Sequence, residues 1–262
     1  MDILQVNSKP RNQKYLVISL LAVVAMWTAG YLSGQKAAIL SSNFAYIPLT
    51  TLLTITAFFQ IYQTRKENRN ISLWYVFAIF ALSYNIAQHM WSLSELITDQ
   101  KPFPSGADAA FIISTISLVI FFMLAIKSEK QSISKWMYVI SIPLGCFTIA
   151  LSTYLFISSN TELALEQILL LFYPVVDSIA LVPALIGIMM YLKGRISFGV
   201  CLICLSMLPL TAGDVLFQIT TTSNTYYSGS ISDLFYYVQI TLLIFGVYTI
   251  SNNETTTSRN VS

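Results

Sequence analysis

Charged residues are scarce in this 262-residue chain: they make up 10% of it, against 55% apolar residues, and the mean hydropathy is +0.67. Soluble domains carry about 25% charged residues, so this composition excludes a soluble globular protein and predicts a lipid bilayer as the surroundings. The net charge is +2, and no concentrated basic face is present. Nucleic acid is therefore excluded as an expected partner.

Histidine and membrane-embedded lysine are also lacking. His89 is the only histidine, which excludes a haem held by two histidines, and no lysine lies deep in an apolar stretch, where a retinal Schiff base would need one. A metal site would need Asp108, Asp177 or Asp214 to complete the ligands of His89, whereas a lone histidine in a polar stripe is more often part of hydrogen-bonded structure. The sequence predicts no cofactor and leaves a metal open.

Cysteine is rare as well, with three residues in the chain. Cys201 and Cys204 form a Cys-x-x-Cys pair, but a thioredoxin-type motif stands at a helix start after a strand. This pair lies instead within an apolar stretch that is predicted to be helical throughout. We interpret Cys146, Cys201 and Cys204 as small packing residues.

Long apolar stretches are abundant, by contrast. Eight of them reach about 20 residues, the length that a helix needs to cross a bilayer. They cover, roughly, residues 15–34, 45–64, 73–93, 107–126, 137–158, 167–192, 196–222 and 232–250. The sequence therefore predicts an all-α, polytopic membrane helix bundle that forms a single membrane domain over residues 1–262, with a polar tail at 251–262. A cleaved signal peptide at the first stretch is the alternative, because a basic region precedes it; it would leave seven spans.

The positions of the basic residues predict the orientation. With the N-terminus inside, twelve of the fourteen Lys and Arg residues lie in inner segments, and only Lys36 and Lys101 lie outside. Lys and Arg in short loops resist translocation. We therefore expect a multi-pass protein of the cell membrane with both termini in the cytoplasm.

Two spans place polar residues at the same helical spacing. The spacing is that of one helix face, and the residues are Asn85, Gln88, His89 and Ser92 in the third span and Thr211, Asp214, Gln218 and Thr221 in the seventh. We interpret residues 1–130 and 131–250 as two four-helix halves. An even number of spans in each half makes them parallel repeats, inserted the same way up.

Two registers relate these halves. Nineteen residues separate His89 from Asp108, and nineteen separate Asp214 from Asp233, which pairs His89 with Asp214. A shift by one residue pairs Gln88 with Asp214 instead and aligns an aromatic residue of each half. The sequence leaves both registers open.

Four aspartates lie within or at the edges of predicted spans, all in the outer half: Asp108, Asp177, Asp214 and Asp233. An Asp at a helix centre costs about 2.5–3.5 kcal/mol to insert, so these residues should face the bundle interior or water. Asp108 and Asp233 begin their spans, where an acid caps free N–H groups. For Asp177 and Asp214 a functional role is the default, with an interhelical hydrogen bond as the alternative. The candidate ligand or ion pocket, open to the outer side, comprises His89, Asp108, Asp177, Asp214, Asp233, Gln88, Asn85 and Gln218.

The segment before the fourth span reads Pro102-Phe103-Pro104-Ser105-Gly106-Ala107-Asp108. It resembles the "FPS-x-AD" segment of multi-span N-terminal sensor regions of bacterial diguanylate cyclases and some histidine kinases. Gly213-Asp214 and Asp233-Leu234-Phe235-Tyr236 are similar to the "GD" and "D-x-x-W/Y" segments in the second half of those regions. Their first half carries "GD-x-x-W", where this chain has Gln88-His89-Met90-Trp91. The resemblance covers roughly spans three to eight and implies an eight-span membrane sensing module of unknown ligand, here without a cytoplasmic output domain.

Two functions fit this pattern. The first is a stand-alone sensory or interaction module whose pocket is read by a cytoplasmic or membrane signalling partner. The second is a small ion- or proton-coupled transporter, for which parallel repeats, a midplane acid and a proline-broken helix are the usual ingredients. A carrier needs a polar path to the inner face, and the inner halves of the spans are nearly devoid of charge, which favours the sensory module. An enzyme is not expected, because no catalytic constellation is evident around His89.

Overall fold

The computed structural model describes residues 13–66, 71–98, 101–129, 133–158 and 164–259, and this part of the chain is helical and contains no strand. The helices are, in chain order, α1 (Gln13–Leu32), α2 (Gln35–Lys66), α3 (Ser72–Thr98), α4 (Gly106–Ser128), α5 (Lys135–Ser158), α6 (Leu165–Leu192), α7 (Phe198–Leu205), α8 (Met207–Thr222) and α9 (Ile231–Arg259). The all-α prediction is confirmed for these residues.

Seven of the described segments are long and apolar enough to cross a membrane: α1, α2, α4, α5, α6, α9, and α7 with α8 taken together. They fit the predicted multi-pass membrane protein. Helix α3 is long enough at 27 residues but is not among the seven, because polar residues such as Asn85, Gln88 and Glu95 lower the hydropathy of its second half. Seven of the eight predicted spans are thus supported by length and apolarity among the described residues, and the count of eight stays a prediction.

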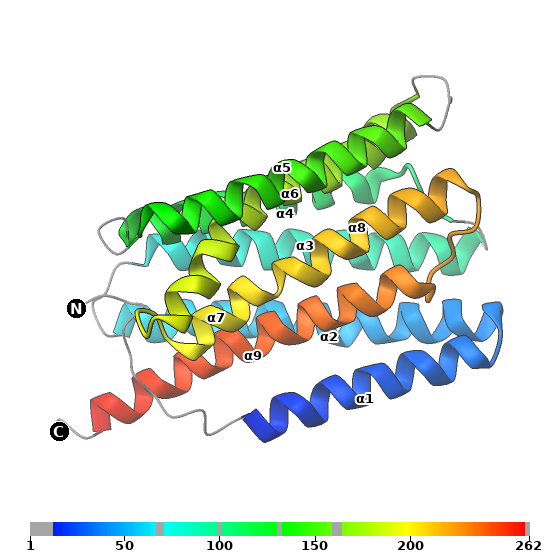
Figure 1. Cartoon of the computed structure of the whole chain (residues 1–262). Coiled ribbons are helices and arrows are strands. Elements are labelled where there is room, and N and C mark those ends of the chain that lie inside the picture. Colours follow the sequence, from blue (N-terminus) through cyan, green and yellow to red (C-terminus); the bar gives the residue numbers. More distant parts are fainter. Residues whose placement is uncertain (1–12, 67–70, 99–100, 130–132, 159–163, 260–262) are drawn as a thin grey trace.

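The helices run side by side along one bundle (Figure 1). One end, which we call the turn end, holds the connections α1–α2, α3–α4 and α8–α9. At the other, the terminal end, α1 begins and α9 finishes. Helices α2, α3 and α4 pack in sequence, as do α6, α7 with α8, and α9, and the two groups meet where α2 packs on α9 and α4 packs on α6.

A continuous apolar core fills the terminal half of the bundle. Its aromatic part centres on Phe77, whose ring centroid lies 5.9 Å from that of Trp74 and 5.1 Å from that of Phe121. Leu243 of α9 and Met207 of α8 are fully buried in the same cluster. Buried polar side chains occur in this half as well, among them Gln60 of α2, which accepts a hydrogen bond from the Ser251 hydroxyl of α9.

The outward faces of α1 and α5 carry large exposed apolar residues, among them Val17, Ile18 and Leu21 on α1 and Val139 and Phe147 on α5. Contiguous exposed apolar surface of this kind is typical of a membrane-facing or partner-facing surface. It agrees with the lipid surroundings that the composition predicts.

The predicted seventh span is divided into two helices at Ser206. Pro209 has no N–H group and therefore cannot bond to the carbonyl of Leu205, four residues earlier. The Ser206 hydroxyl donates to the carbonyl of Ile203 at 2.6 Å and is itself fully buried. Helix α8 starts afresh after this break, about two turns before Asp214.

Candidate functional site

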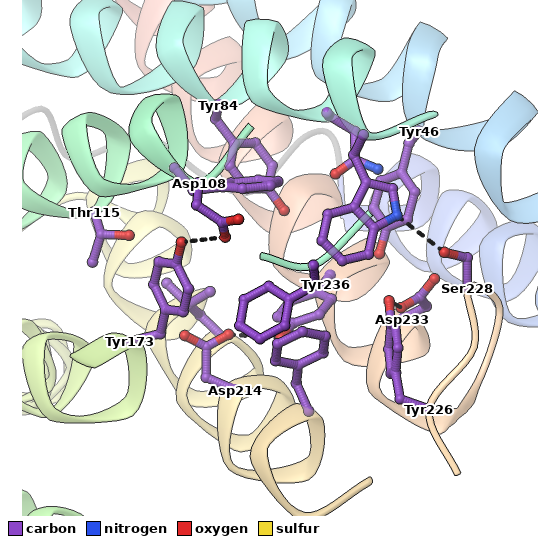
Figure 2. A pocket seen from close by; sticks show the side chains of 16 residues that line it. Tyr46, Tyr84, Asp108, Thr115, Tyr173, Asp214, Tyr226, Ser228, Asp233 and Tyr236 are labelled. Atoms are coloured by element: carbon purple, nitrogen blue, oxygen red, sulfur yellow. Dashed lines mark hydrogen bonds between the residues drawn. The ribbon is translucent and has the colours of Figure 1, made fainter. Parts of the chain in front are cut away.

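A cavity of about 650 Å³, counting its mouth, lies in the turn half of the bundle. Figure 2 shows its wall, with Asp108, Tyr173 and Asp214 on one side of the view and Asp233 with Tyr226 on the other. The sixteen lining residues are Tyr46, Tyr84, Gln88, Trp91, Phe103, Asp108, Phe111, Thr115, Tyr173, Leu210, Asp214, Phe217, Tyr226, Ser228, Asp233 and Tyr236. They come from α2, α3, α4, α6, α8 and α9 and from two connections, so both groups of helices build the wall.

Asp108 combines the capping role that the sequence predicts with a place in the cavity wall. Ser105 caps α4: its hydroxyl accepts from the N–H of Ala107 at 3.2 Å, and its own N–H donates to Asp108 Oδ2 at 2.6 Å. This is a capping box, which satisfies otherwise free backbone donors of the first turn. The second carboxyl oxygen accepts from the hydroxyl of Tyr173 on α6 at 2.8 Å.

Asp233 occupies the equivalent position at the start of α9. Its Oδ2 accepts from the N–H of Gly229 and from the hydroxyl of Ser42 on α2, both at 2.7 Å, and its Oδ1 accepts from Tyr226 at 3.3 Å. Gly229 has a φ of 89°, and a Cβ there would come within 2.5 Å of the carbonyl oxygen of Ala38. A glycine is therefore required for the connection to approach α2 and reach Asp233.

Asp214 is held by Tyr236, whose hydroxyl donates to its Oδ1 at 2.6 Å. The close approach of α8 and α9 depends on Gly213, because a Cβ at that position would lie 2.8 Å from the Tyr236 ring. The adjacent pair Gly213-Asp214 thus has a physical explanation: the glycine leaves room for the Tyr236 ring, and the aspartate accepts a hydrogen bond from its hydroxyl.

Asp177 lies behind the cavity wall. It is 1% exposed, it does not line the cavity, and neither of its carboxyl oxygens receives a hydrogen-bond donor from the described residues. It neighbours the Asp214 carboxyl.

Three other predicted site residues lie away from the cavity. Asn85 accepts from the hydroxyl of Thr50 at 2.8 Å and so joins α3 to α2. Half-buried His89 bonds through Nδ1 to the carbonyl of Asn85 at 2.8 Å, within its own helix. Gln218 joins α8 to α5, because its Oε1 accepts from the Ser152 hydroxyl at 2.7 Å and its Nε2 donates to the Ser152 carbonyl at 3.1 Å. Of the eight candidates, the structure brings Gln88, Asp108, Asp214 and Asp233 to the cavity.

The described residues contain no group of three or more His, Cys, Asp or Glu side chains that could hold a metal ion. A metal completed by aspartates around His89 is therefore not assembled there. In the same part of the chain Cys201 and Cys204 are buried and form no disulfide, which agrees with their interpretation as packing residues, whereas Cys146 is exposed and the interpretation is wrong for it.

Aromatic residues form most of the wall, and the sequence analysis missed them as site residues. Nine of the sixteen lining residues are Tyr, Trp or Phe. The Trp91 ring lies edge-on to Phe111 and Phe217 at 6.3 Å, and its indole N–H donates to Ser228 at 3.2 Å. A signal for them exists in a recurring sequence spacing: five pairs of lining residues stand 126 or 125 positions apart. The pairs are Tyr84 with Leu210, Gln88 with Asp214, Trp91 with Phe217, Asp108 with Asp233, and Phe111 with Tyr236.

The tyrosine hydroxyls of the wall fall into two groups. Those of Tyr173, Tyr226 and Tyr236 each donate to one aspartate. Those of Tyr46 and Tyr84 have no hydrogen-bond partner among the described residues. Burial, together with the negative charge of Asp233, raises the pKa of the Tyr226 hydroxyl well above its usual range, so this group stays a hydrogen-bond donor at all physiological pH values.

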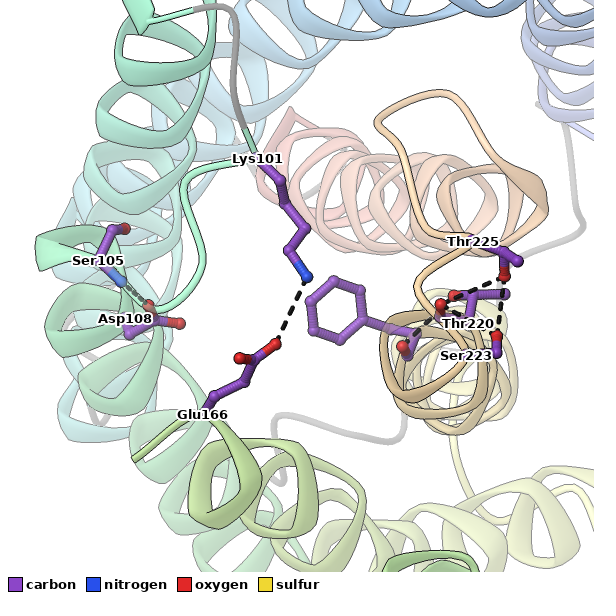
Figure 3. Close-up of polar contacts among 8 residues, drawn as sticks. Lys101, Ser105, Asp108, Glu166, Thr220, Ser223 and Thr225 are labelled. Carbon is purple, nitrogen blue, oxygen red and sulfur yellow. Dashed lines mark hydrogen bonds and ion pairs between the residues drawn. The ribbon is translucent and has the colours of Figure 1, made fainter. Parts of the chain in front are cut away.

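Lys101 is the basic residue closest in sequence to the wall at the turn end. Its ammonium group lies 3.6 Å from Glu166 Oε1 and 5.5 Å above the centroid of the Phe103 ring. Figure 3 shows this ion pair reaching from the α3–α4 connection to the start of α6, while Thr220, Ser223 and Thr225 form a separate polar cluster at the end of α8. Lys101 thus lies beside a residue of the wall without lining the cavity.

Comparison of the chain with protein-family models, with curated proteins and with solved structures finds no match.

Proposed function

We propose that this protein is a sensory or interaction module of the cell membrane, which binds a small ligand in the cavity of its turn half. One observation carries the proposal: a cavity lined by three aspartates lies in the turn half of the bundle, and both groups of helices build its wall. Tyr84 and Leu210 of this wall belong to the same apolar cluster as Phe77, Phe121 and Met207, so the cavity lies directly on the apolar core. A polar site on an apolar core suits a protein that binds a ligand and reports it.

The same proposal includes eight crossings and an outward-facing turn end. Helix α3 packs between α2 and α4 and is long enough to serve as the eighth span. Among the described residues, the turn end has Lys36 and Lys101, while the other basic residues stand at helix ends or connections of the terminal end. The positive-inside rule then puts the terminal end, with both chain termini, in the cytoplasm.

Internal duplication is part of the proposal as well. In the first half, α2 packs on α3 and α3 packs on α4; in the second half, α6 packs on α7 and α8, and these pack on α9. The contact of α4 with α6 likewise corresponds to the contact of α9 with α2. The paired lining residues support the register in which Gln88 corresponds to Asp214. In that register both halves contribute equally to one cavity, as expected for parallel repeats around a shared axis.

We also propose that the chain is related to the sensor regions of diguanylate cyclases and histidine kinases that it resembles. Its motif residues Phe103, Asp108, Asp214, Asp233 and Tyr236 all line the cavity, which gives the short motifs a common location. A signalling partner in the membrane or the cytoplasm would read the occupied state through the helices.

A transporter is the second candidate, and one observation favours it. A smaller cavity of about 290 Å³ lies at the terminal end between α4, α6 and α7, next to Glu129. A carrier would connect it with the main cavity by rearranging the same helices. The two functions therefore differ in whether the main cavity is ever reached from the terminal side.

Vectorial labelling distinguishes them without knowledge of the ligand. The native residues Cys146, Cys201 and Cys204 are first replaced, and Thr115→Cys is then introduced in the cavity wall. The matched control is Ser141→Cys, at a position that is fully buried on α5 and outside the cavity. A membrane-impermeant maleimide should label Thr115→Cys from the outer side of oriented vesicles and leave Ser141→Cys unlabelled. Labelling from both sides would support the transporter. Labelling from neither side, or from the inner side alone, would refute an outward-facing binding cavity.

A further inference from the structure

We propose that the cavity binds an organic ammonium cation: a small molecule with a positively charged amine carried on an apolar or aromatic body. This inference rests on the proposed function, in which the cavity is a ligand site, and adds the chemical class of the ligand. Charge, the nature of the walls and the arrangement of the carboxyls each point to it.

The charge of the cavity is acidic. Asp108, Asp214 and Asp233 line it, Asp177 lies behind Asp214, and no Lys, Arg or His is among the lining residues. Lys101 is beside the wall but forms an ion pair with Glu166. In a site walled by apolar groups, carboxylate charge acts at low dielectric and attracts cations strongly.

The walls suit an organic cation. Nine aromatic rings surround the carboxyls, and aromatic faces attract ammonium groups within about 6 Å of the ring centroid. The protein already shows this contact at its own wall, where the Lys101 ammonium lies 5.5 Å from the centroid of Phe103. A ligand with an ammonium group and an apolar body would satisfy the carboxyls and the rings together.

The carboxyls are arranged poorly for a metal ion. Asp108, Asp214 and Asp233 belong to three different helices, and each already accepts a tyrosine hydroxyl. Calcium needs six to eight oxygen ligands converging within about 2.6 Å, and the described residues contain no such cluster. An organic ammonium needs only one or two of these oxygens, with the rings supplying the rest of its contacts.

The polar groups of the wall restrict the ligand further. The hydroxyls of Tyr46 and Tyr84 have no protein partner among the described residues, and Gln88 adds an amide to the wall. These groups offer hydrogen bonds to a polar substituent on the body of the cation.

The test uses the full-length purified protein and a pair of probes that differ in charge but hardly in shape. Choline is compared with its neutral isostere 3,3-dimethyl-1-butanol, with phenethylamine as an aromatic primary ammonium and sodium chloride as the ionic-strength control. Saturable binding is followed by thermal unfolding and tryptophan fluorescence, to which Trp91 of the wall contributes. Choline or phenethylamine should bind saturably, and the neutral isostere should bind at least about tenfold more weakly.

Variants then locate the binding. Asp214→Asn should weaken ammonium binding at least about tenfold, whereas Glu129→Gln, the same carboxyl-to-amide change at the terminal end, should leave it unchanged. If Asp214→Asn does not fold, the comparison of choline with its isostere on the wild type decides alone. Wild-type protein that binds neither ammonium probe, or binds the isostere equally well, overturns the inference. In that case labelling of Thr115→Cys from the outer side would still uphold the proposed function, so the two failures are separable.

Discussion

The crossing of α7 and α9 at two glycines gives the sharpest prediction for the fold. A Cβ on Gly199 would lie 2.7 Å from the carbonyl oxygen of Gly246 and 2.7 Å from Cγ1 of Ile250, and a Cβ on Gly246 would lie 2.9 Å from the carbonyl oxygen of Gly199. Ordinary carbon–oxygen contacts begin several tenths of an ångström further apart. Backbone atoms of both helices are involved, so the helices must separate to admit a methyl group. Small residues at such crossings are what allows membrane helices to pack closely.

The expected size of the effect follows from two opposing contributions. Overpacking of this kind costs about 1–3 kcal/mol, and replacing a helical glycine by alanine recovers about 1 kcal/mol of helix propensity. Gly199→Ala should therefore destabilise the protein by about 0–2 kcal/mol net, toward the upper value because backbone rather than a side-chain tip must move. The double variant Gly199→Ala, Gly246→Ala should be less destabilised than the sum of the single variants, because both methyl groups open the same crossing.

The assay is equilibrium unfolding of the purified chain in mixed micelles, with Gly106→Ala as the control. A Cβ on Gly106 meets only the end of the flexible Met90 side chain, at 3.3 Å, so this variant should be as stable as the wild type or slightly more so. The reasoning would be refuted if Gly199→Ala were more stable than Gly106→Ala, or if the two glycine variants were strictly additive.

Three further variants test contacts of the site and its frame by thermal unfolding. Tyr236→Phe removes the hydroxyl that donates to Asp214 and should lower the free energy of unfolding by about 1.5–3 kcal/mol if that carboxyl is charged. The control Tyr62→Phe, at an exposed tyrosine, should leave stability unchanged. Equal stability of the two variants would contradict the role of the Tyr236–Asp214 bond. Ser105→Ala removes the cap of α4 and should cost about 1 kcal/mol, compared with no change for the exposed Ser33→Ala. Ser152→Ala removes the hydroxyl that donates to Gln218 and should lower the free energy of unfolding by about 0.6–2 kcal/mol. Its control is Ser158→Ala, at an exposed serine of the same helix. If Ser152→Ala has the stability of the wild type, this bond contributes nothing.

Much of the fold could be predicted from hydropathy, and its departures have local causes. Helix α2 begins at Gln35, about ten residues before the apolar stretch, because the φ of 97° at Gly34 lets the chain turn directly from α1 into the next helix. The seventh span was predicted as one helix over 196–222, and Pro209 divides it at Ser206. Apolarity locates membrane segments, but it carries no information on where a helix is interrupted inside them.

Three of the four aspartates that the sequence singles out line the cavity and Asp177 does not, whereas the aromatic residues of the wall could not be predicted. Asp108, Asp214 and Asp233 stand out because charge in a membrane segment is rare, and all three line the cavity. Tyr46, Tyr84 and Tyr173 do not stand out, since aromatic residues are common in membrane helices wherever they pack. His89 and Gln88 are neighbours in sequence but point about 100° apart on a helix, so of these two candidates Gln88 lines the cavity and His89 bonds within α3.

Two aspartates join the cavity wall to the first turns of two helices. Asp108 and Asp233 stabilise the first turns of α4 and α9, which belong to different halves of the chain, and the same carboxyls face the ligand space. First turns of helices open at low free-energy cost compared with the core. If the cavity binds a ligand as proposed, contacts with these carboxyls should make this local opening rarer at both helix starts, and amide hydrogen exchange there should become slower. The proposed ligand would then act by reducing local disorder at two distant points of the sequence, without any helix having to shift along its axis.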